Sequence, residues 1–378
     1  MPTKTLVRIV AFALAFASQA AAQEAKPSPS PSPTAAPGRT DDQERVRVFT
    51  EEVRLPVLAV DQYGHFDPSL EADDILVLED GTPQQIKSVR HIPASVLMLL
   101  DMGGEMSMAK STKSTRDIAL RLLARLKEGD SVSVMQFSER VELLQDWTTE
   151  TDDVARVLRT KLSGGRRARL AEGIVAAVKQ LKTTPAGSRH LVIVTDGVET
   201  PGGKVKFEEA VKQLVATQAT VHVISYSALV RQAINKRYKS SIFKPGTGEI
   251  KNGTAGPDPT VPAGTSRVTS VTLATIDTDR EMRRWFKNYA KATEASEQRL
   301  TLLAAESGGR ILLPQLADEM VKQSDEVARE IGAQYVVTYR PTRPLSEAKP
   351  GEYRRIEIAA RRVGLNLRTR RGYVTTPP

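Results

Sequence analysis

The sequence predicts an α/β fold in which a doubly wound, mostly parallel sheet is inserted into a small all-β domain built from both ends of the chain. Between residues 94 and 333, expected strands alternate with expected helices, as in parallel sheets. Several of these strands are continuously apolar, as in HLVIVTDG from His190, which indicates strands covered by helices on both faces. Residues 45–92 and 334–375 contain only expected strands, so the simplest arrangement joins them in one domain.

The first 22 residues have the organisation of a secretory signal peptide. Lys4 and Arg8 precede an apolar stretch at residues 9–17, and small residues lead to an A-x-A cleavage site ending at Ala22. The apolar stretch is too short for an ordinary transmembrane helix, although an uncleaved anchor is the alternative. We expect a periplasmic or secreted protein without a transmembrane segment after cleavage. The sequence has no cysteine for lipid attachment or disulfides.

Residues 23–43 are expected to form a linker. They contain SPSPSPT at residues 28–34, within a stretch that favours extended polyproline II and provides no apolar face. Residues 45–92 then form the first part of the all-β domain, with partly alternating apolar residues, a strand at 75–78 and a strand at 85–91. Asp80-Gly81 between these strands predicts a hairpin, because both residues tolerate positive φ.

The region 94–333 carries the alternating pattern. We expect strands at residues 96–100, 131–137, 141–144, 190–195, 221–226 and 310–313, and helices at 109–126, 151–162, 170–181, 207–217, 300–307 and 317–331. In the first helix Ile118, Leu122 and Leu126 lie on one stripe, as in a helix that faces a core. The pattern fails between about 228 and 298, where a stretch rich in Gly, Pro and Thr, flanked by two helical segments, indicates an insertion.

The C-terminal part of the all-β domain, residues 334–375, is expected to hold strands at 335–339, 353–360 and 365–373. It also carries a run of arginines, namely Arg354, Arg355, Arg361, Arg362, Arg368, Arg370 and Arg371. We expect a solvated sheet face whose charge discourages pairing of sheet edges. The alternative is contact with an anionic envelope surface.

The composition is that of an ordinary globular protein with an excess of positive charge. Of the 378 residues, 40% are hydrophobic and 26% are charged, and the formal net charge is +9. This charge favours anionic partners or surfaces. We do not expect nucleic acid as a partner, because an exported chain without interleaved aromatic residues or a nucleic-acid-binding fold gives no basis for it.

The sequence gives no convincing sign of enzyme chemistry, so we expect that the chain is not an enzyme. It contains no cysteine nucleophile and no G-x-S-x-G motif. His190 and His222 lie at the starts of expected parallel strands, opposite the end where such sheets bind ligands, and are expected to be structural. The stretches at Gly202 and Gly246 lack the rest of a phosphate loop or a dinucleotide fingerprint.

Four segments of the 94–333 region resemble, in order and spacing, the motifs of a von Willebrand factor A domain. They are VLMLLDMGGEM, GDSVSVMQFSERVELLQDWT, LSGGRRARLAEGI and HLVIVTDGVET. The flanking segments LEADDILVLEDGTPQQI and GEYRRIEIAARRVGLNLRTRRGYV resemble a bacterial exported VWFA-related family. The resemblance covers nearly all of residues 45–375 apart from the insertion. It implies a Rossmann-like sheet and protein binding through a metal-ion-dependent adhesion site.

The resemblance implies a Mg²⁺ site at the carboxyl ends of the strands, with Asp-x-Ser-x-Ser in one loop, a Thr in a second and an Asp in a third. In this sequence the two Asp positions are Asp101 and Asp196. The two Ser positions are Gly103 and Glu105, and the Thr position is Ala168. Three hydroxyl ligands are therefore absent, and we expect a degenerate metal site of Asp101, Glu105 and Asp196.

Three hypotheses remain open for this site. In the first, the site is inactive, and its acidic residues only cap turns and helix starts. In the second, Glu105 replaces the hydroxyl ligands, and three carboxylates hold a hard cation such as Mg²⁺. In the third, an arginine of the loop that contains Arg166, Arg167 and Arg169 supplies the missing positive charge and pairs with a carboxylate.

The expected function is an exported protein-interaction module of the adhesion or scaffold type, with an unidentified protein partner of acidic character. We expect no resident cofactor, and Mg²⁺ only if the second hypothesis holds. The alternatives are a metal-dependent envelope hydrolase that uses Asp101 or Asp196, and an adhesion module whose Mg²⁺ site survives.

Overall fold

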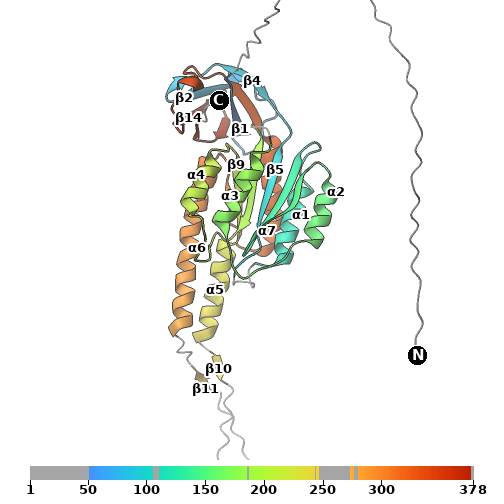
Figure 1. The fold of residues 1–378 in the computed structure, drawn as a ribbon, viewed down its shortest axis with the longest axis vertical. Helices are drawn as coiled ribbons and strands as arrows, with labels where there is room; N and C mark the ends of the chain where they lie inside the picture. Colours follow the sequence, from blue (N-terminus) through green and yellow to red (C-terminus); the bar gives the residue numbers. More distant parts are fainter. Residues whose placement is uncertain are drawn as a thin grey trace, which may run out of the picture. The chain divides into compact units, whose positions relative to one another are not determined.

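The computed structural model describes residues 51–104, 110–184, 187–242, 244–246, 273–275 and 280–375 of the 378-residue chain, whose fold is drawn in Figure 1. The expected signal peptide at residues 1–22, the linker at 23–43, Glu105 and the central part of the insertion lie outside the described residues. Among the described residues, no helix has both the length and the apolar character needed to cross a membrane.

A six-stranded sheet forms the centre of the α/β domain. Its strand order is β12-β9-β8-β5-β6-β7, and every neighbouring pair is parallel except β6 with β7. The strands are β5 Ser95–Asp101, β6 Ser131–Phe137, β7 Val141–Thr148, β8 Arg189–Thr195, β9 Thr220–Ser225 and β12 Ile311–Leu312. The predicted doubly wound, mostly parallel sheet is therefore confirmed.

Helices cover both faces of this sheet. They are α1 Thr112–Leu123, α2 Thr151–Thr160, α3 Leu170–Leu181, α4 Phe207–Val215, α5 Ser227–Ile242, α6 Arg280–Glu306 and α7 Ala317–Ala333. Alternate residues of β5 enter two different cores. Met98 and Leu100 pack in the core formed with α1 and α7, whereas Leu97 and Leu99 pack in the core formed with α3 and α4. This two-sided burial explains why the strand is continuously apolar.

Two of the expected helices begin at a different residue from the predicted one, and the others differ by at most two residues at their ends. α1 begins at Thr112, three residues later than expected, because Ser111 caps it by accepting a hydrogen bond from the backbone N–H of Ser114 at 3.0 Å. The helix expected at residues 300–307 is only the end of α6, which has 27 residues and begins at Arg280. α6 packs along α5 (Figure 1), and beyond these helices the short strands β10 Lys244–Gly246 and β11 Leu273–Thr275 pair antiparallel.

Strands from both ends of the chain form two antiparallel four-stranded sheets, with orders β15-β1-β13-β4 and β16-β14-β2-β3. The strands are β1 Val53–Asp61, β2 Ile75–Glu79, β3 Thr82–Pro83, β4 Ile86–Arg90, β13 Tyr335–Tyr339, β14 Tyr353–Ala360, β15 Leu365–Thr369 and β16 Gly372–Val374, with short 3-10 helices at Ala72–Asp74 and Leu345–Glu347. Leu55, Val337 and Tyr373 share one apolar core. The predicted all-β unit built from both ends is confirmed.

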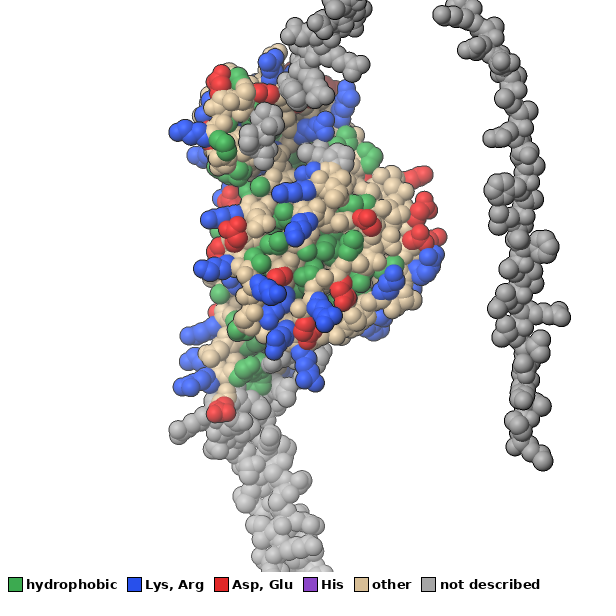
Figure 2. All heavy atoms as spheres, in the orientation of Figure 1, with side chains coloured by type: hydrophobic (Ala, Val, Ile, Leu, Met, Phe, Trp, Pro, Cys, Tyr) green, Lys and Arg blue, Asp and Glu red, His purple; other side chains and the backbone are tan. Residues whose placement is uncertain are grey.

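The arginines of the C-terminal strands do not all lie on a solvated face. Lys and Arg side chains occur across the face shown in Figure 2, with Asp and Glu among them. The side chain of Arg355 is 72% exposed. Arg354 and Arg370, in contrast, are 0% and 3% exposed. The expectation of a solvated arginine face is therefore wrong for these two residues, because each donates hydrogen bonds inside the protein.

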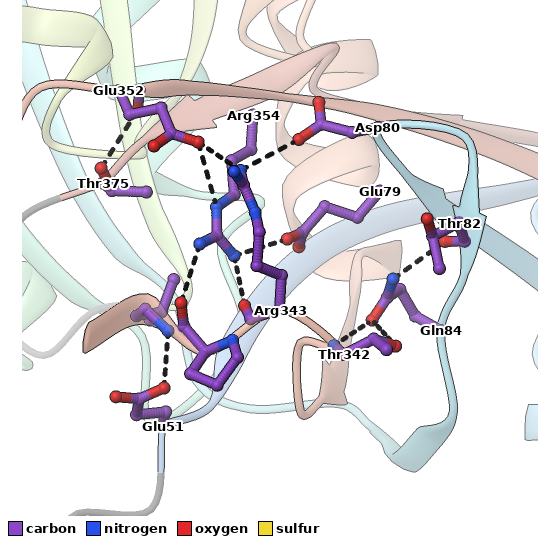
Figure 3. Close-up of polar contacts among 12 residues, drawn as sticks. Glu51, Glu79, Asp80, Thr82, Gln84, Thr342, Arg343, Glu352, Arg354 and Thr375 are labelled. Carbon is purple, nitrogen blue, oxygen red and sulfur yellow. Dashed lines mark hydrogen bonds and ion pairs between the residues drawn. The ribbon is translucent and has the colours of Figure 1, made fainter. Parts of the chain in front are cut away.

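Arg354 connects the two chain ends through a buried ion pair with Glu79 of β2 (Figure 3). Its Nη1 lies 2.7 Å from Glu79 Oε1, and its guanidinium also donates to the carbonyl oxygens of residues 343 and 344, at 2.7 and 3.0 Å. The hydroxyls of Tyr339 and Tyr373 donate to Glu79 Oε2 at 2.7 and 3.0 Å. A buried charge pair of this kind is tolerated because these neutral partners satisfy most of the remaining hydrogen-bonding capacity, while Arg354 Nε lies 3.9 Å from Glu352.

Candidate functional site

The two aspartates predicted for the site lie at the carboxyl ends of neighbouring parallel strands. Asp101 is the last residue of β5, and Asp196 directly follows β8. They are 0% and 2% exposed. The carboxyl ends of parallel strands meet at one edge of the sheet, so the fold brings these carboxylates together where open α/β sheets bind ligands. The third predicted residue, Glu105, lies outside the described part of the chain.

A lysine that the sequence analysis did not single out lies between these carboxylates. Lys110 Nζ is 2.7 Å from Asp101 Oδ1 and 4.0 Å from Asp196 Oδ2, and the Lys110 side chain is 9% exposed. Lys110 directly precedes Ser111, the N-cap of α1. The helix dipole disfavours a cation at this end of a helix unless acidic groups compensate it. A lysine at a predicted helix start, close in sequence to a conspicuous Asp, is the signal that could have identified it.

Hydrogen bonds from the surrounding protein orient both carboxylates. The Thr195 hydroxyl donates to Asp101 Oδ2 at 2.6 Å, and Tyr289 of α6 donates its hydroxyl to Asp196 Oδ2 at 3.2 Å. The other oxygen of each carboxylate accepts the backbone N–H two residues later in the chain, at 3.0 Å for Asp101 and 2.9 Å for Asp196. The positions of the two acidic groups are therefore set by the fold itself.

Burial and mutual charge determine how these groups ionise. Burial raises the pKa of Asp101 to about 6, and Asp196 adds to this rise while Lys110 and Thr195 oppose it. Burial lowers the pKa of Lys110, but the attraction of the two carboxylates outweighs this effect, so its pKa is raised above the ordinary value. Lys110 is therefore charged at neutral pH.

Asp101 and Lys110 line a pocket of about 390 Å³ at this edge of the sheet. Its wall is completed by Gly103 and Gly104, by the first residues of α1 and by residues 164–166 of the following loop. The side chain of Lys110 is the cation nearest to Asp101 on this wall. The pocket is therefore the place where a ligand could approach the buried charge cluster.

Two of the three positions that correspond to the missing hydroxyl ligands, Gly103 and Ala168, are closed in the described part of the chain. A Cβ on Gly103 would lie 1.9 Å from the carbonyl oxygen of Arg167 and 2.9 Å from the Cα of Ala168, so the backbone of the second loop fills the space that a serine would need. Ala168 is 2% exposed, and its N–H donates to the Thr200 hydroxyl at 2.9 Å. Neither position has a side-chain oxygen.

These residues do not fit an octahedral Mg²⁺ site. Mg²⁺ requires near-ideal geometry and six oxygen ligands, whereas Asp101 and Asp196 have an ammonium group between them. Within the described ranges, no group of three or more His, Cys, Asp or Glu residues is placed to hold a metal ion.

The arginines of the second loop do not supply the internal cation. Arg169 Nη1 donates to the carbonyl oxygen of Thr200 at 2.9 Å, and Arg167 presents its backbone carbonyl to Gly103. Arg166 lies on the wall of the pocket. The third hypothesis thus named the wrong residue: the positive charge beside Asp101 comes from Lys110.

The two histidines of the parallel strands lie inside the protein. His190 and His222 are 0% and 1% exposed, and their rings stack with centroids 5.7 Å apart. Burial lowers the pKa of both, that of His222 to about 3, so both are neutral at physiological pH. They are placed as internal packing residues, as predicted.

The comparisons with known proteins give one family match. The family model for the von Willebrand factor type A domain matches residues 95–248. No curated protein matches the chain. Solved structures similar to it include an aerotolerance-related membrane protein from Bacteroides fragilis NCTC 9343, with 14% identity and a TM-score of 0.37 over 63% of this chain and 99% of that one.

Two further solved structures cover a similar or larger part of this chain. The PilB minor pilin from Streptococcus sanguinis has 11% identity and a TM-score of 0.39 over 65% of this chain and 63% of that one. A von Willebrand factor type A protein from Catenulispora acidiphila has 9% identity and a TM-score of 0.39 over 85% of this chain and 73% of that one.

Proposed function

Because the chain carries a von Willebrand factor type A domain at residues 95–248, we propose that it is an exported protein-interaction module whose adhesion site uses an internal lysine in place of a metal ion. Domains of this type bind proteins. The observation that carries the proposal is the Lys110 ammonium, which lies 2.7 Å from Asp101 and 4.0 Å from Asp196.

An ammonium group at this position performs part of the role of Mg²⁺. It offsets negative charge that two buried carboxylates would otherwise hold without compensation, which is costly in a low-dielectric environment. A Mg²⁺ ion would have to displace this group and replace the hydroxyl ligands at Gly103 and Ala168, which have no side-chain oxygen. We therefore infer that the domain binds its partner without a metal ion.

The proposed partner presents an acidic side chain to the pocket beside Asp101. Lys110 and Arg166 are the cationic residues on its wall. The charge of Lys110 is shared with the two buried carboxylates, so Arg166 is the cation that favours an acidic partner and increases the rate at which the two proteins meet. This places the acidic group of the partner at the same sheet edge that a metal-bound carboxylate would occupy.

Thermal melting tests the metal independence. Melts of the wild-type mature protein in millimolar Mg²⁺ and in chelator should coincide, because metal binding at a hundredfold excess over its Kd would add about 2.7 kcal/mol of stability. In Lys110→Ala the two carboxylates lose their counter-charge, and Mg²⁺ should stabilise this variant more than the wild type. Lys113→Ala is the matched control, since this side chain is 82% exposed. A Mg²⁺ shift in the wild type that Asp101→Ala abolishes would instead support a surviving metal site.

Cross-linking in the native envelope tests the interaction. The same protein partner should be captured with and without chelator. Lys110→Gln should reduce the capture, while Lys113→Gln should leave it unchanged. Capture that depends on added Mg²⁺ would contradict the proposal.

We also propose that the module is exported and is not an enzyme. Export rests on the signal-peptide pattern of residues 1–22, and N-terminal sequencing of the mature protein should find Gln23 first. The absence of catalysis rests on Lys110, which pairs with Asp101 and lies 4.0 Å from Asp196, the two carboxylates that a hydrolase could use. A broad hydrolase screen should detect no turnover, and turnover lost in Asp196→Ala would overturn this part.

A further inference from the structure

A groove between α5 and α6 has three exposed cations on its wall. It has a volume of about 730 Å³ and is lined by Ile234 and Asn235 of α5 together with residues of α6, including Arg284, Lys287 and Lys291. All three cations are exposed. Within the part of the chain that the structure describes, none of them has an ion-pair partner within 4.0 Å, so the rim of the groove carries a net positive charge that Glu294 offsets only in part.

Helical spacing places these cations in one row. Positions 284, 287 and 291 are three and four residues apart, so their side chains follow one face of α6 over about 10 Å. Below this row, Ile234 and Phe286 are 2% and 3% exposed and form an apolar floor. Figure 2 shows Lys and Arg side chains gathered along the edge formed by α6. The groove thus combines an apolar floor with a positive rim.

The row does not stabilise the free protein. Like charges three or four residues apart on a helix repel by a few tenths of a kcal/mol per pair. The only acidic residue that lines this groove, within the described ranges, is Glu294. Elsewhere the same two helices are joined by a compensated pair, in which Arg231 Nη1 lies 2.5 Å from Glu297 Oε2. The contrast suits a surface whose charges are compensated by a partner.

We propose that this groove binds an acidic amphipathic helix of a partner protein. Carboxylates at positions i, i+3 and i+7 of such a helix would pair with the three cations, and an apolar side chain between them would enter the groove. The surface is separate from the Lys110 pocket, although Tyr289 on the same helix contacts Asp196. The proposal therefore goes beyond the adhesion site and does not depend on it.

An anionic membrane fits this surface less well. A membrane-binding helix exposes large apolar side chains next to its cations. In the described part of α6 the exposed large apolar residue is Leu302, about three turns away from Lys291. A concave groove also matches a helix better than a flat bilayer.

Fluorescence anisotropy with a designed peptide tests the proposal on the mature full-length protein. The probe is a fluorescein-labelled helical peptide with Glu at i, i+3 and i+7 and Leu between them, and its counterpart has Gln in place of Glu. The Glu peptide should bind about tenfold more tightly than the Gln peptide, which three rim ion pairs can supply. The combined variant Arg284→Glu, Lys287→Glu and Lys291→Glu should lose this preference, and the milder change of all three to Gln should weaken it.

The matched control reverses the same number of positive charges on a different part of the surface. Lys179, Lys182 and Lys212 are exposed lysines on or next to α3 and α4, and their change to Glu should leave peptide binding intact. Equal losses in both combined variants would show that only net charge matters and would overturn the proposal. A second outcome would also overturn the proposal: no binding of the peptide, but binding to vesicles of phosphatidylglycerol and phosphatidylcholine that the groove variant loses. The groove would then be a membrane-binding surface and not a site for a partner helix.

Discussion

Two buried ion pairs, Glu79–Arg354 in the all-β domain and Asp101–Lys110 in the α/β domain, have the same distance of 2.7 Å and different surroundings. In the first pair the guanidinium also lies 3.9 Å from Glu352, but that carboxylate is 24% exposed and has a second cation, Arg343, as its partner. Two tyrosines and two backbone carbonyls supply further hydrogen bonds to this pair. In the second, one ammonium serves two carboxylates beside a pocket. Burial alone therefore does not mark a functional site; the imbalance of charge and the access to it do.

Removing the arginine of the Glu79–Arg354 pair should cause the largest loss of stability. Arg354→Met leaves Glu79 buried without a counter-charge, and we expect a loss of about 3–5 kcal/mol in the free energy of unfolding. Urea denaturation measures it. The neighbouring Arg355→Met is the control, because that side chain is 72% exposed, and it should cost less than about 0.5 kcal/mol. Similar losses in both variants would show that Arg354 does not hold the chain ends together.

The contribution of the Asp101–Lys110 pair to the free energy of unfolding should depend on pH. Burial raises the pKa of Asp101 from its ordinary value of 3.8 to about 6, so between these values the native state binds a proton that the unfolded state has released. The contribution of Asp101 to stability is therefore fully present below pH 3.8 and is lost as pH rises through about 6.

Comparison with Asp101→Asn isolates this effect. From pH 4 to pH 7, the unfolding free energy of the wild type relative to this variant should fall by up to about 3 kcal/mol, which corresponds to the difference between the two pKa values. Chemical denaturation at several pH values measures it. A difference that is constant with pH would show that Asp101 is ionised throughout this range and that Lys110 fully compensates it.

Adding a side chain at Gly103 should lower the free energy of unfolding by a smaller amount. A Cβ there would meet the Arg167 carbonyl oxygen at 1.9 Å, and relieving this contact requires a backbone shift, so Gly103→Ala should cost about 2 kcal/mol. Gly164→Ala on the same pocket is the control, since its Cβ would have no neighbour closer than 3.8 Å. If Gly103→Ala were as stable as this control in thermal melts, the site would be open enough for a restored serine.

Most of the fold could be predicted from the sequence because its signals are periodic and local. Continuous apolar strands such as residues 190–195 indicate burial on two faces, and segments near both chain ends that contain only expected strands indicate the two antiparallel sheets. The boundary of α1 was missed by three residues because its cap, Ser111, is one of several hydroxyl residues in that stretch. The continuity of α6 was missed: the segment before residue 300 was expected to be helical, but it was assigned to the flank of the insertion and not joined to the helix at 300–307.

The site could be predicted only in part. Asp101 and Asp196 were assigned from the resemblance to von Willebrand factor A domains, and their position at the carboxyl ends of parallel strands agrees with where open α/β sheets bind ligands. The roles of Lys110 and Arg354 depend on which charges meet across the fold, and a sequence pattern does not specify these pairings. Lys110 is nine residues from its partner and Arg354 is 275 residues from Glu79, so the second pairing had no local signal at all.

Removing Arg343, which lies at the exposed edge of the Glu79–Arg354 network, should cause the smallest loss of stability. Arg343 lies between Asp80 and Glu352 (Figure 3), and its Nη2 is 3.3 Å from Asp80 Oδ2, but its side chain is 49% exposed. Water and salt screen such a pair, so Arg343→Met should cost less than about 1 kcal/mol, and the loss should shrink further in high salt. The backbone carbonyl of residue 343, which accepts from Arg354, is retained in this variant. Urea denaturation at low and high ionic strength measures both effects. A salt-independent loss as large as that of Arg354→Met would mean that the buried network extends to the surface, and the two ion pairs compared above would then differ less than their surroundings indicate.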